Sequence, residues 1–133
     1  MLSAIASATL ILVSIVLHGQ VLDTSHLAPC THSDSTVQVH RLYDDSLCTS
    51  FVICIPRSVA RHYHRYHTEH VMVLEGAGII QLGDSTFSIS AGTSIVIPKG
   101  TAHGVRTTSL TPLRVISVQS PRFDGTDRIF IEP

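Results

Sequence analysis

The sequence lacks several patterns that would assign it to a common functional class. Its 133 residues carry nine Lys and Arg against ten Asp and Glu, and the basic residues form no cluster. Because nucleic-acid-binding proteins normally present a basic patch, we expect no nucleic-acid partner. No C-x-x-C pair occurs among the three cysteines, which excludes a zinc-finger arrangement. Helical periodicity is absent over most of the chain, which argues against a helical fold.

Charge is also missing from the amino-terminal segment. Residues 1–22 contain no Asp, Glu, Lys or Arg, and residues 4–17 are apolar apart from small Ser and Thr. Fourteen residues at helical rise span about 21 Å, short of the roughly 30 Å hydrocarbon core of a membrane. This length favours a signal peptide over residues 1–20, although the usual basic start is absent. The alternatives are an uncleaved anchor and sequence upstream of the true start.

A functional signal would make the protein exported, either periplasmic or secreted. Otherwise we expect a cytoplasmic protein, or one attached to a membrane through this segment alone. Cysteine usage does not decide between these compartments. Three cysteines allow at most one internal disulfide, and we expect Cys30, Cys48 and Cys54 to be structural.

What the chain does contain is a series of short β-branched runs separated by turn signals, the pattern of an all-β sandwich or barrel. Gly83-Asp84 suits a tight hairpin turn, since glycine takes positive φ without steric cost. We divide the chain into residues 1–20, a leader with a first strand at 21–45, a barrel at 46–121 and a tail at 122–133. The tail is expected to hold a further short strand at 129–131. The expected barrel strands are Phe51–Ile55, Ala60–His64, Glu69–Leu74, Gly78–Leu82, Thr86–Ile89, Ser94–Ile97, Gly104–Thr108 and Leu113–Gln119.

Three histidines and one glutamate have the spacing of ligands for one metal ion. His62 and His64 alternate on an expected strand, so their side chains project from the same face. Glu69 follows His64 closely, and His103 lies in a second cluster. Imidazole and carboxylate ligands suit Fe, Mn, Ni, Cu or Zn, and we expect one such divalent ion. A merely His-rich tract at 62–70 would not account for His103.

The Gly and Pro positions around these residues resemble the two sequence motifs of the cupin superfamily. The first reads H-Y-H-R-Y-H-T-E-H-V-M-V-L-E-G from His62, and the second reads G-T-S-I-V-I-P-K-G-T-A-H from Gly92. The resemblance covers roughly residues 50–121. Pro56 stands where the first motif has its initial Gly, and Thr107 stands where the second motif has its final Asn.

The resemblance implies both a fold and a ligand set. Cupins are double-stranded β-helix, or jelly-roll, barrels of antiparallel strands in two facing sheets. In the family, the metal is bound by the residues that correspond to His62, His64, Glu69 and His103. The resemblance also implies a small-molecule ligand and a homodimer.

Three functions stay open for such a centre. We favour a metal-dependent dioxygenase or other oxidoreductase acting on a small anionic organic molecule. A Lewis-acid sugar isomerase, epimerase or lyase would need a proton shuttle, for which the nearest candidates are Tyr63, Tyr66 and His67. A non-catalytic module that binds a metal or small ligand is the third option. Fold and ligand set are shared by all three, so neither selects a reaction.

Strand alternation also predicts which side chains surround the site. Val71 and Val73 should lie inside with Glu69, and Val105 and Thr107 with His103. Gln119 shares this parity on the last strand and either contacts a ligand or faces solvent. We expect His67 and His70 to face solvent.

Overall fold

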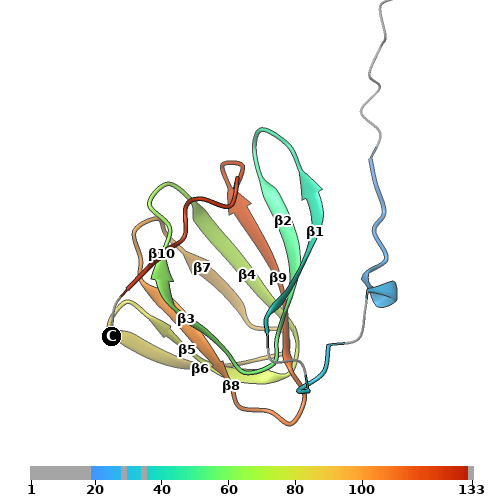
Figure 1. The fold of residues 1–133 in the computed structure, drawn as a ribbon, viewed down its shortest axis with the longest axis vertical. Coiled ribbons are helices and arrows are strands. Elements are labelled where there is room, and N and C mark those ends of the chain that lie inside the picture. The colour runs from blue at the N-terminus through green and yellow to red at the C-terminus, as the bar shows by residue number, and fades with distance from the viewer. Residues whose placement is uncertain (1–18, 28–29, 34–35, 132–133) are drawn as a thin grey trace, which may run out of the picture.

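Two antiparallel sheets of five strands each face one another in the part of the chain that the computed structural model describes, residues 19–27, 30–33 and 36–131 (Figure 1). One short 3-10 helix, η1 (Thr24–His26), precedes the strands. The strands are β1 (Gln38–Asp44), β2 (Thr49–Ile55), β3 (Ser58–Tyr63), β4 (Thr68–Glu75), β5 (Ala77–Leu82), β6 (Ser85–Ser90), β7 (Ser94–Ile97), β8 (His103–Thr107), β9 (Leu113–Ser120) and β10 (Ile129–Phe130).

The first sheet has the strand order β1-β2-β9-β4-β7, and the second has the order β10-β3-β8-β5-β6. This confirms the expected all-β jelly-roll barrel. Each of the eight expected barrel strands is present with its ends within two residues, and β1 and β10 each add an outer strand to one sheet. Most of the expected export signal lies outside the described residues. Within the described ranges, no helix has the length and apolar character needed to cross a membrane.

The core lies between the sheets because the strands alternate as the sequence predicts. On β9, every second residue from Leu113 to Gln119 is buried. Period-2 alternation of this kind turns one face of a strand inward and the other outward. The buried core consists of Phe51, Ile53, Ile55, Val73, Ile80, Ile89, Ile95, Ile97, Leu113, Val115 and Phe123.

Two glycines allow turns that other residues would strain. Gly83 has φ +58° in the two-residue turn between β5 and β6, so the expected hairpin at Gly83-Asp84 is confirmed. Gly76 has φ +79° between β4 and β5. A Cβ atom added at Gly76 would lie 2.6 Å from the carbonyl oxygen of Pro112. Both the conformation and the close approach therefore require glycine there.

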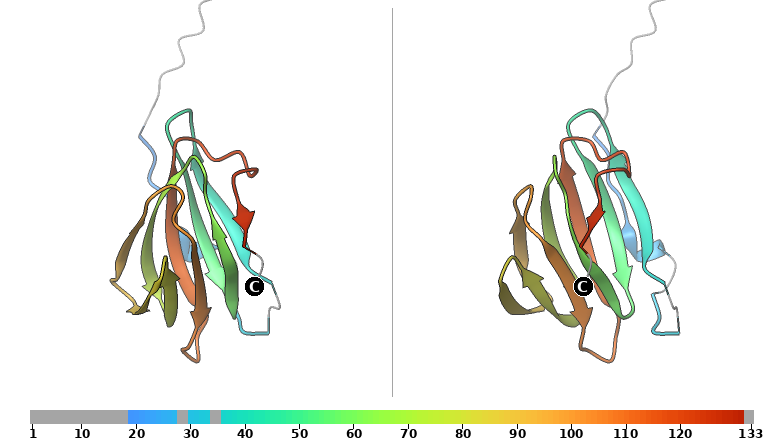
Figure 2. Two further views of the ribbon diagram at one scale, coloured as in Figure 1. Left: turned by 90° about the vertical axis from the view of Figure 1, so that its left-hand side faces the viewer. Right: turned by 60° about the vertical axis from the view of Figure 1, so that its left-hand side comes forward.

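The segment after β9 crosses back over one end of the barrel, as Figure 2 shows. Its final strand, β10, pairs with β3 and places Phe130 opposite His62. Near the start of this tail, the Phe123 amide donates to the Thr49 hydroxyl at 2.9 Å, and the Phe123 side chain joins the core. The tail is therefore held both to the first sheet and to the second.

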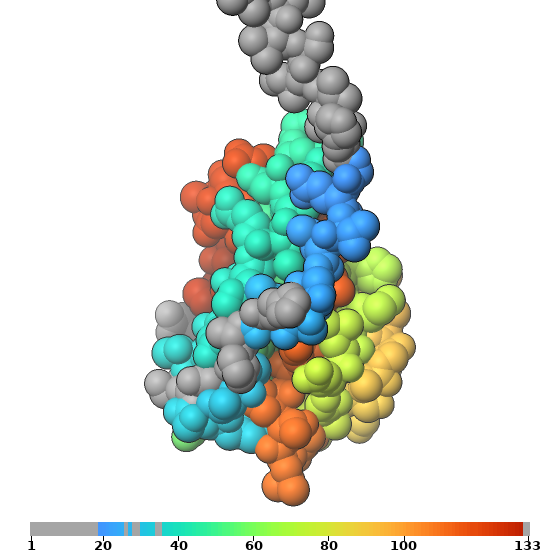
Figure 3. All heavy atoms as spheres, turned by 90° about the vertical axis from the view of Figure 1, so that its right-hand side faces the viewer, coloured from blue at the N-terminus to red at the C-terminus, as the bar shows by residue number. Residues whose placement is uncertain are grey.

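The chain before β1 lies along the outside of the first sheet (Figure 3). Arg114 of β9 donates a hydrogen bond to the carbonyl oxygen of Thr24 at 2.7 Å. Cys30 and Cys54 form a disulfide, with Cα atoms 5.8 Å apart, and Cys48 is a free, half-buried thiol. The expectation that at most one disulfide forms is met, and the bond fastens the leader to the outer face of β2.

Candidate metal centre

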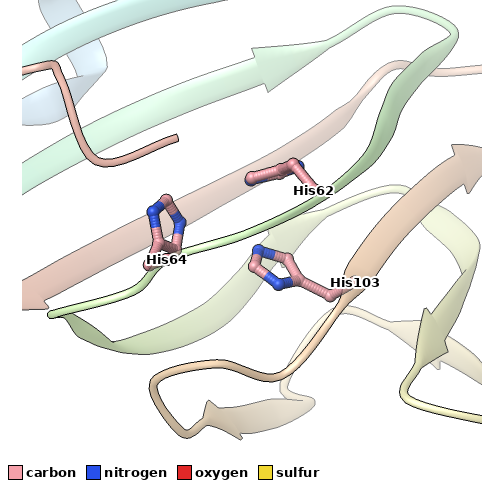
Figure 4. A group of neighbouring side chains, drawn as sticks. All are labelled: His62, His64 and His103. Atoms are coloured by element: carbon pink, nitrogen blue, oxygen red, sulfur yellow. The ribbon is translucent and has the colours of Figure 1, made fainter. Parts of the chain in front are cut away.

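Three of the four candidate ligands, the histidines, cluster at one end of the barrel interior, and Glu69 lies beside His64 and His103. His62 lies on β3, His64 directly follows β3, and His103 begins β8. Each of the three histidines and Glu69 of β4 is buried, with 2–6% of the residue exposed. His62 and His103 are direct cross-strand partners, so their rings share the inward face. Figure 4 shows the three imidazoles turned toward one another. One ring nitrogen of each lies within 4.8 Å of a ring nitrogen of the other two.

Main-chain carbonyls orient the three imidazoles. Nδ1 of His62 bonds to the carbonyl oxygen of Ala60 at 2.8 Å, and Nδ1 of His103 bonds to that of Thr101 at 2.9 Å. Nδ1 of His64 bonds to the carbonyl oxygen of Asp127. A carbonyl oxygen only accepts hydrogen bonds, so each Nδ1 carries the hydrogen. In the neutral ring this leaves the lone pair on Nε2, the arrangement that metal-binding histidines require.

Two of the three Nε2 atoms, those of His64 and His103, are buried and lack a hydrogen-bond partner among the described residues. Both lie 3.3 Å from Oε2 of Glu69. Ligands held at about 2.1 Å from one ion lie roughly 3 Å apart, so these separations suit a shared metal. The unpaired nitrogens and the carboxylate oxygen are thus placed as donors to a common point.

The carboxyl group of Glu69 is held in its charged form. Burial opposes ionisation, but polar contacts with His103, His64 and Ser117 outweigh it and keep the pKa of Glu69 well below its usual value. Ser117 of β9 donates to Oε1 at 2.5 Å, which leaves Oε2 directed toward the histidines. Sequence reasoning did not identify Ser117, although its parity with Gln119 on β9 was the available signal.

Two of the histidines respond differently to this environment. Burial is the main cause that lowers the pKa of His62 to about 4, so this ring is neutral at pH 7. Burial also acts against charge on His64, but the Glu69 carboxylate and the Asp127 carbonyl raise its pKa. A metal ion would take the place of the proton shared by His64 and Glu69. Three imidazoles and one carboxylate fit Fe, Mn, Ni, Cu or Zn.

A cavity of about 100 Å³ opens beside this cluster. His62, Glu69 and His103 form its polar wall, and Arg128 from the tail is the other charged residue that lines it. The remaining lining residues are aliphatic apart from one glycine: Val37, Val39, Ile53, Ile55, Val59, Val71, Ile80, Ile89, Ile95, Ile97, Gly104, Val105 and Val115. The site therefore combines a small apolar chamber with a dense set of metal-type donors.

The alternation expected around the ligands is found. Val71 and Val105 line the cavity and Val73 is 1% exposed, whereas His70 and Met72 face outward. The outward position of His70 agrees with its expected solvent exposure. Its Nε2 lies within hydrogen-bond distance of Ser94 Oγ, at 2.7 Å.

The expectation for His67 is wrong. This residue is 5% exposed, and its Nδ1 lies 2.5 Å from Oδ2 of Asp127. Its Nε2 bonds to the carbonyl oxygen of Arg122 at 2.9 Å. Asp127 also accepts hydrogen bonds from the amides of Arg65 and Tyr66, both at 2.8 Å. The tail, whose path the sequence does not reveal, covers His67 and buries it.

Asp127 is the central residue of this contact. Burial opposes its ionisation, but His67 and the amides of Tyr66 and Arg65 lower the pKa of Asp127 to about 2. The carboxylate therefore stays charged and holds the loop between β3 and β4. Sequence reasoning missed Asp127 and Arg128, because the expected short strand at 129–131 does not reveal where the preceding part of the tail packs.

The chain belongs to the cupin family: the family model described as a cupin domain matches residues 51–119. Among curated proteins it is similar to mannose-1-phosphate guanylyltransferase RfbM of Salmonella typhimurium, with 37% identity over 68 residues. That match covers 51% of this chain and 14% of the relative, so the chain spans only a small part of the longer protein.

Solved structures show the same fold. A conserved protein with a double-stranded β-helix domain from Klebsiella pneumoniae has a TM-score of 0.71 at 17% identity, covering 87% of this chain and all (100%) of that one. KdgF from Halomonas has a TM-score of 0.64 at 24% identity, covering 68% of this chain and 85% of that one. At these identities the likeness establishes the barrel alone.

Proposed function

We propose that this cupin holds one divalent transition metal through His62, His64, Glu69 and His103. Its substrate would be a small anionic organic molecule, and its activity that of an oxygenase or other oxidoreductase. The observation that carries the proposal is a buried cluster of three histidines with Glu69 beside it, of which His62, Glu69 and His103 line an aliphatic cavity. When bound, the metal supplies Lewis-acid or redox chemistry next to the substrate.

The chain's own residues have separate roles in this proposal. The carbonyls of Ala60, Asp127 and Thr101 fix the imidazoles, and Ser117 fixes Glu69. The aliphatic walls exclude water, which strengthens electrostatic interactions within the cavity. Arg128 supplies the positive charge that attracts an anion to the opening.

The proposed reaction class is supported by which groups reach the cavity. Proton transfer by a side chain requires a base within hydrogen-bond reach of the substrate. Tyr63, Tyr66 and His67, the expected shuttle candidates, do not line the cavity. Tyr66 is 65% exposed, and both ring nitrogens of His67 are engaged by the tail. This placement favours chemistry that depends on the metal more than on a protein base.

A second candidate is Lewis-acid chemistry on a sugar, by an isomerase, epimerase or lyase. It is favoured by the similarity to mannose-1-phosphate guanylyltransferase, whose name specifies a phosphorylated sugar. A non-catalytic module that binds metal or a small ligand is the third candidate, since the same cavity and donors would serve it.

The decisive experiment measures metal per chain by elemental mass spectrometry in untagged protein. Wild type is compared with Glu69→Gln and His103→Ala, and His70→Ala serves as the matched control because His70 faces outward. We expect close to one metal per chain in wild type and the control, and at least a tenfold loss in both ligand variants. Protein that takes up no metal even after reconstitution would overturn the proposed site.

Oxygen consumption then separates the candidate reactions. Iron-, manganese-, copper- or nickel-loaded wild type is screened for oxygen uptake with small organic acids. Uptake that disappears in Glu69→Gln supports the oxygenase. Stoichiometric zinc and no uptake would shift the proposal to Lewis-acid chemistry or binding.

Export and dimer formation are further parts of the proposal. The Cys30–Cys54 disulfide supports an oxidising compartment, as expected for an exported protein. Met72 and Val96 are 46% and 57% exposed on the outer face of the first sheet, which supports pairing of two copies through that face. Light scattering coupled to size exclusion tests the dimer, and a monomeric mass would remove it.

A further inference from the structure

Gln119 lies directly opposite the proposed metal ligand Glu69 in the first sheet. The two residues are direct cross-strand partners on β9 and β4. Side chains opposite one another in an antiparallel pair lie on the same face, with Cβ atoms about 5 Å apart. Gln119 therefore points into the barrel beside the metal centre, and it is 1% exposed. Of the two alternatives that the sequence left open, the solvent-facing one is wrong.

The side-chain oxygen of Gln119 has no partner in the described part of the chain. Oε1 is buried and accepts no hydrogen bond from those residues. Leaving a buried acceptor unpaired costs about 1–3 kcal/mol, and native proteins rarely retain such groups without a reason. Because Oε1 can only accept, it requires a hydrogen-bond donor.

Gln119 lines a cavity. A second cavity, of about 250 Å³, is lined by Gln119 together with Phe51, Phe123 and Arg128. It shares Val39, Ile53 and Arg128 with the cavity beside the metal centre. The two spaces thus adjoin, with Arg128 at their common border.

We infer that Gln119 and Arg128 together select a small organic acid that carries a hydroxyl or amino group. Oε1 of Gln119 accepts a hydrogen bond from that group, and the Arg128 guanidinium pairs with the carboxylate. The inference rests on the proposed function, because the same molecule reaches the metal through the adjoining cavity. Its residues are separate from the four metal ligands, so the two proposals fail independently.

The substitution Gln119→Met separates recognition from structure. Methionine has a similar length and no buried acceptor, so we expect ligand-free Gln119→Met to melt at the same temperature as wild type or higher. A structural Gln119 would instead make this variant less stable. Gln81→Met is the matched control, since Gln81 is exposed on β5.

Binding is measured by titration calorimetry on metal-loaded protein with three acids of one carbon skeleton: succinate, malate and aspartate. We expect wild type and Gln81→Met to prefer malate or aspartate to succinate by about tenfold, roughly the net value of one hydrogen bond. Gln119→Met should lose this preference and keep its metal. Arg128→Gln should weaken all three acids, whereas Arg106→Gln, on the outward side of β8, should not.

Each other outcome has a defined meaning. Metal-loaded wild type that shows no preference, or binds none of the acids, overturns the inference and leaves the metal centre standing. A preference that survives in Gln119→Met also overturns it. Protein that takes up no metal overturns the proposed function instead.

Discussion

The carbonyl oxygen of Asp127 accepts a hydrogen bond from Nδ1 of His64, a residue 63 positions earlier in the chain. One residue of the tail thus orients a proposed metal ligand through its main chain. The same residue binds His67 and two loop amides through its carboxylate. The geometry of the proposed metal centre therefore depends on a segment outside both cupin motifs.

Asp127→Asn should weaken both the fold and the site. The amide keeps the size of the side chain but removes the charge that faces His67, so we expect the free energy of unfolding to fall by about 1–3 kcal/mol. Looser positioning of His64 should lower metal affinity about tenfold. Denaturant unfolding and metal competition measure the two effects. Asp124→Asn is the control: the Asp124 carboxylate accepts its hydrogen bonds from Thr126 within the exposed tail, so this variant should change neither.

Metal should raise the melting temperature of the protein. A ligand that binds only the folded state adds about 2.7 kcal/mol at a free concentration of 100 Kd. We expect this gain in wild type and in His70→Ala, and its loss in the double variant His62→Ala/His64→Ala. Calorimetry with and without metal provides the measurement. An unchanged response in the double variant would refute the ligand assignment.

Removal of the Cys30–Cys54 disulfide should destabilise the barrel. The bond joins residues 24 positions apart, and closing a loop of this length contributes about 3 kcal/mol in the chain-entropy description. Cys30→Ala/Cys54→Ala should lose about this amount and no longer respond to reductant. Cys48→Ala should still respond, because Cys48 is the free cysteine. Thiol titration that finds three reactive groups in unreduced, denatured wild type would contradict the pairing.

Acid should weaken the attachment of the tail to the first sheet. Hydrogen bonds from Arg122 and Thr49 lower the pKa of Asp44 from its ordinary value of 3.8. The unfolded chain therefore binds a proton more readily, so this stabilisation is present above pH 3.8 and is lost as the pH falls through the folded-state pKa. Asp44→Asn should lose less stability than wild type as the pH falls from 5 to 2. This range roughly brackets the pKa of Asp44 in the unfolded chain and its lowered pKa in the folded protein. Parallel pH curves from urea unfolding would contradict the prediction.

The sequence predicted those parts of the site that depend on local spacing. His62 and His64 alternate on one strand, and His103 starts a strand that pairs with it, so alternation and the motif offsets were sufficient. His67 was misplaced because its contacts with Asp127 and Arg122 join a loop to a tail of irregular backbone. Neither the loop nor the tail has a repeating pattern of apolar residues from which such a contact could be predicted. For Gln119, alternation predicted that its side chain lies on the same face of the last strand as Ser117 and Val115. It did not predict whether that end of the barrel is buried or open to solvent.

The tail contributes to the centre in two chemically distinct ways. It orients His64 with a carbonyl group, which every amino acid possesses, but it reaches the cavities with the side chain of Arg128. We therefore expect a substitution at position 128 to change which acids bind while the carbonyl contact to His64 is kept.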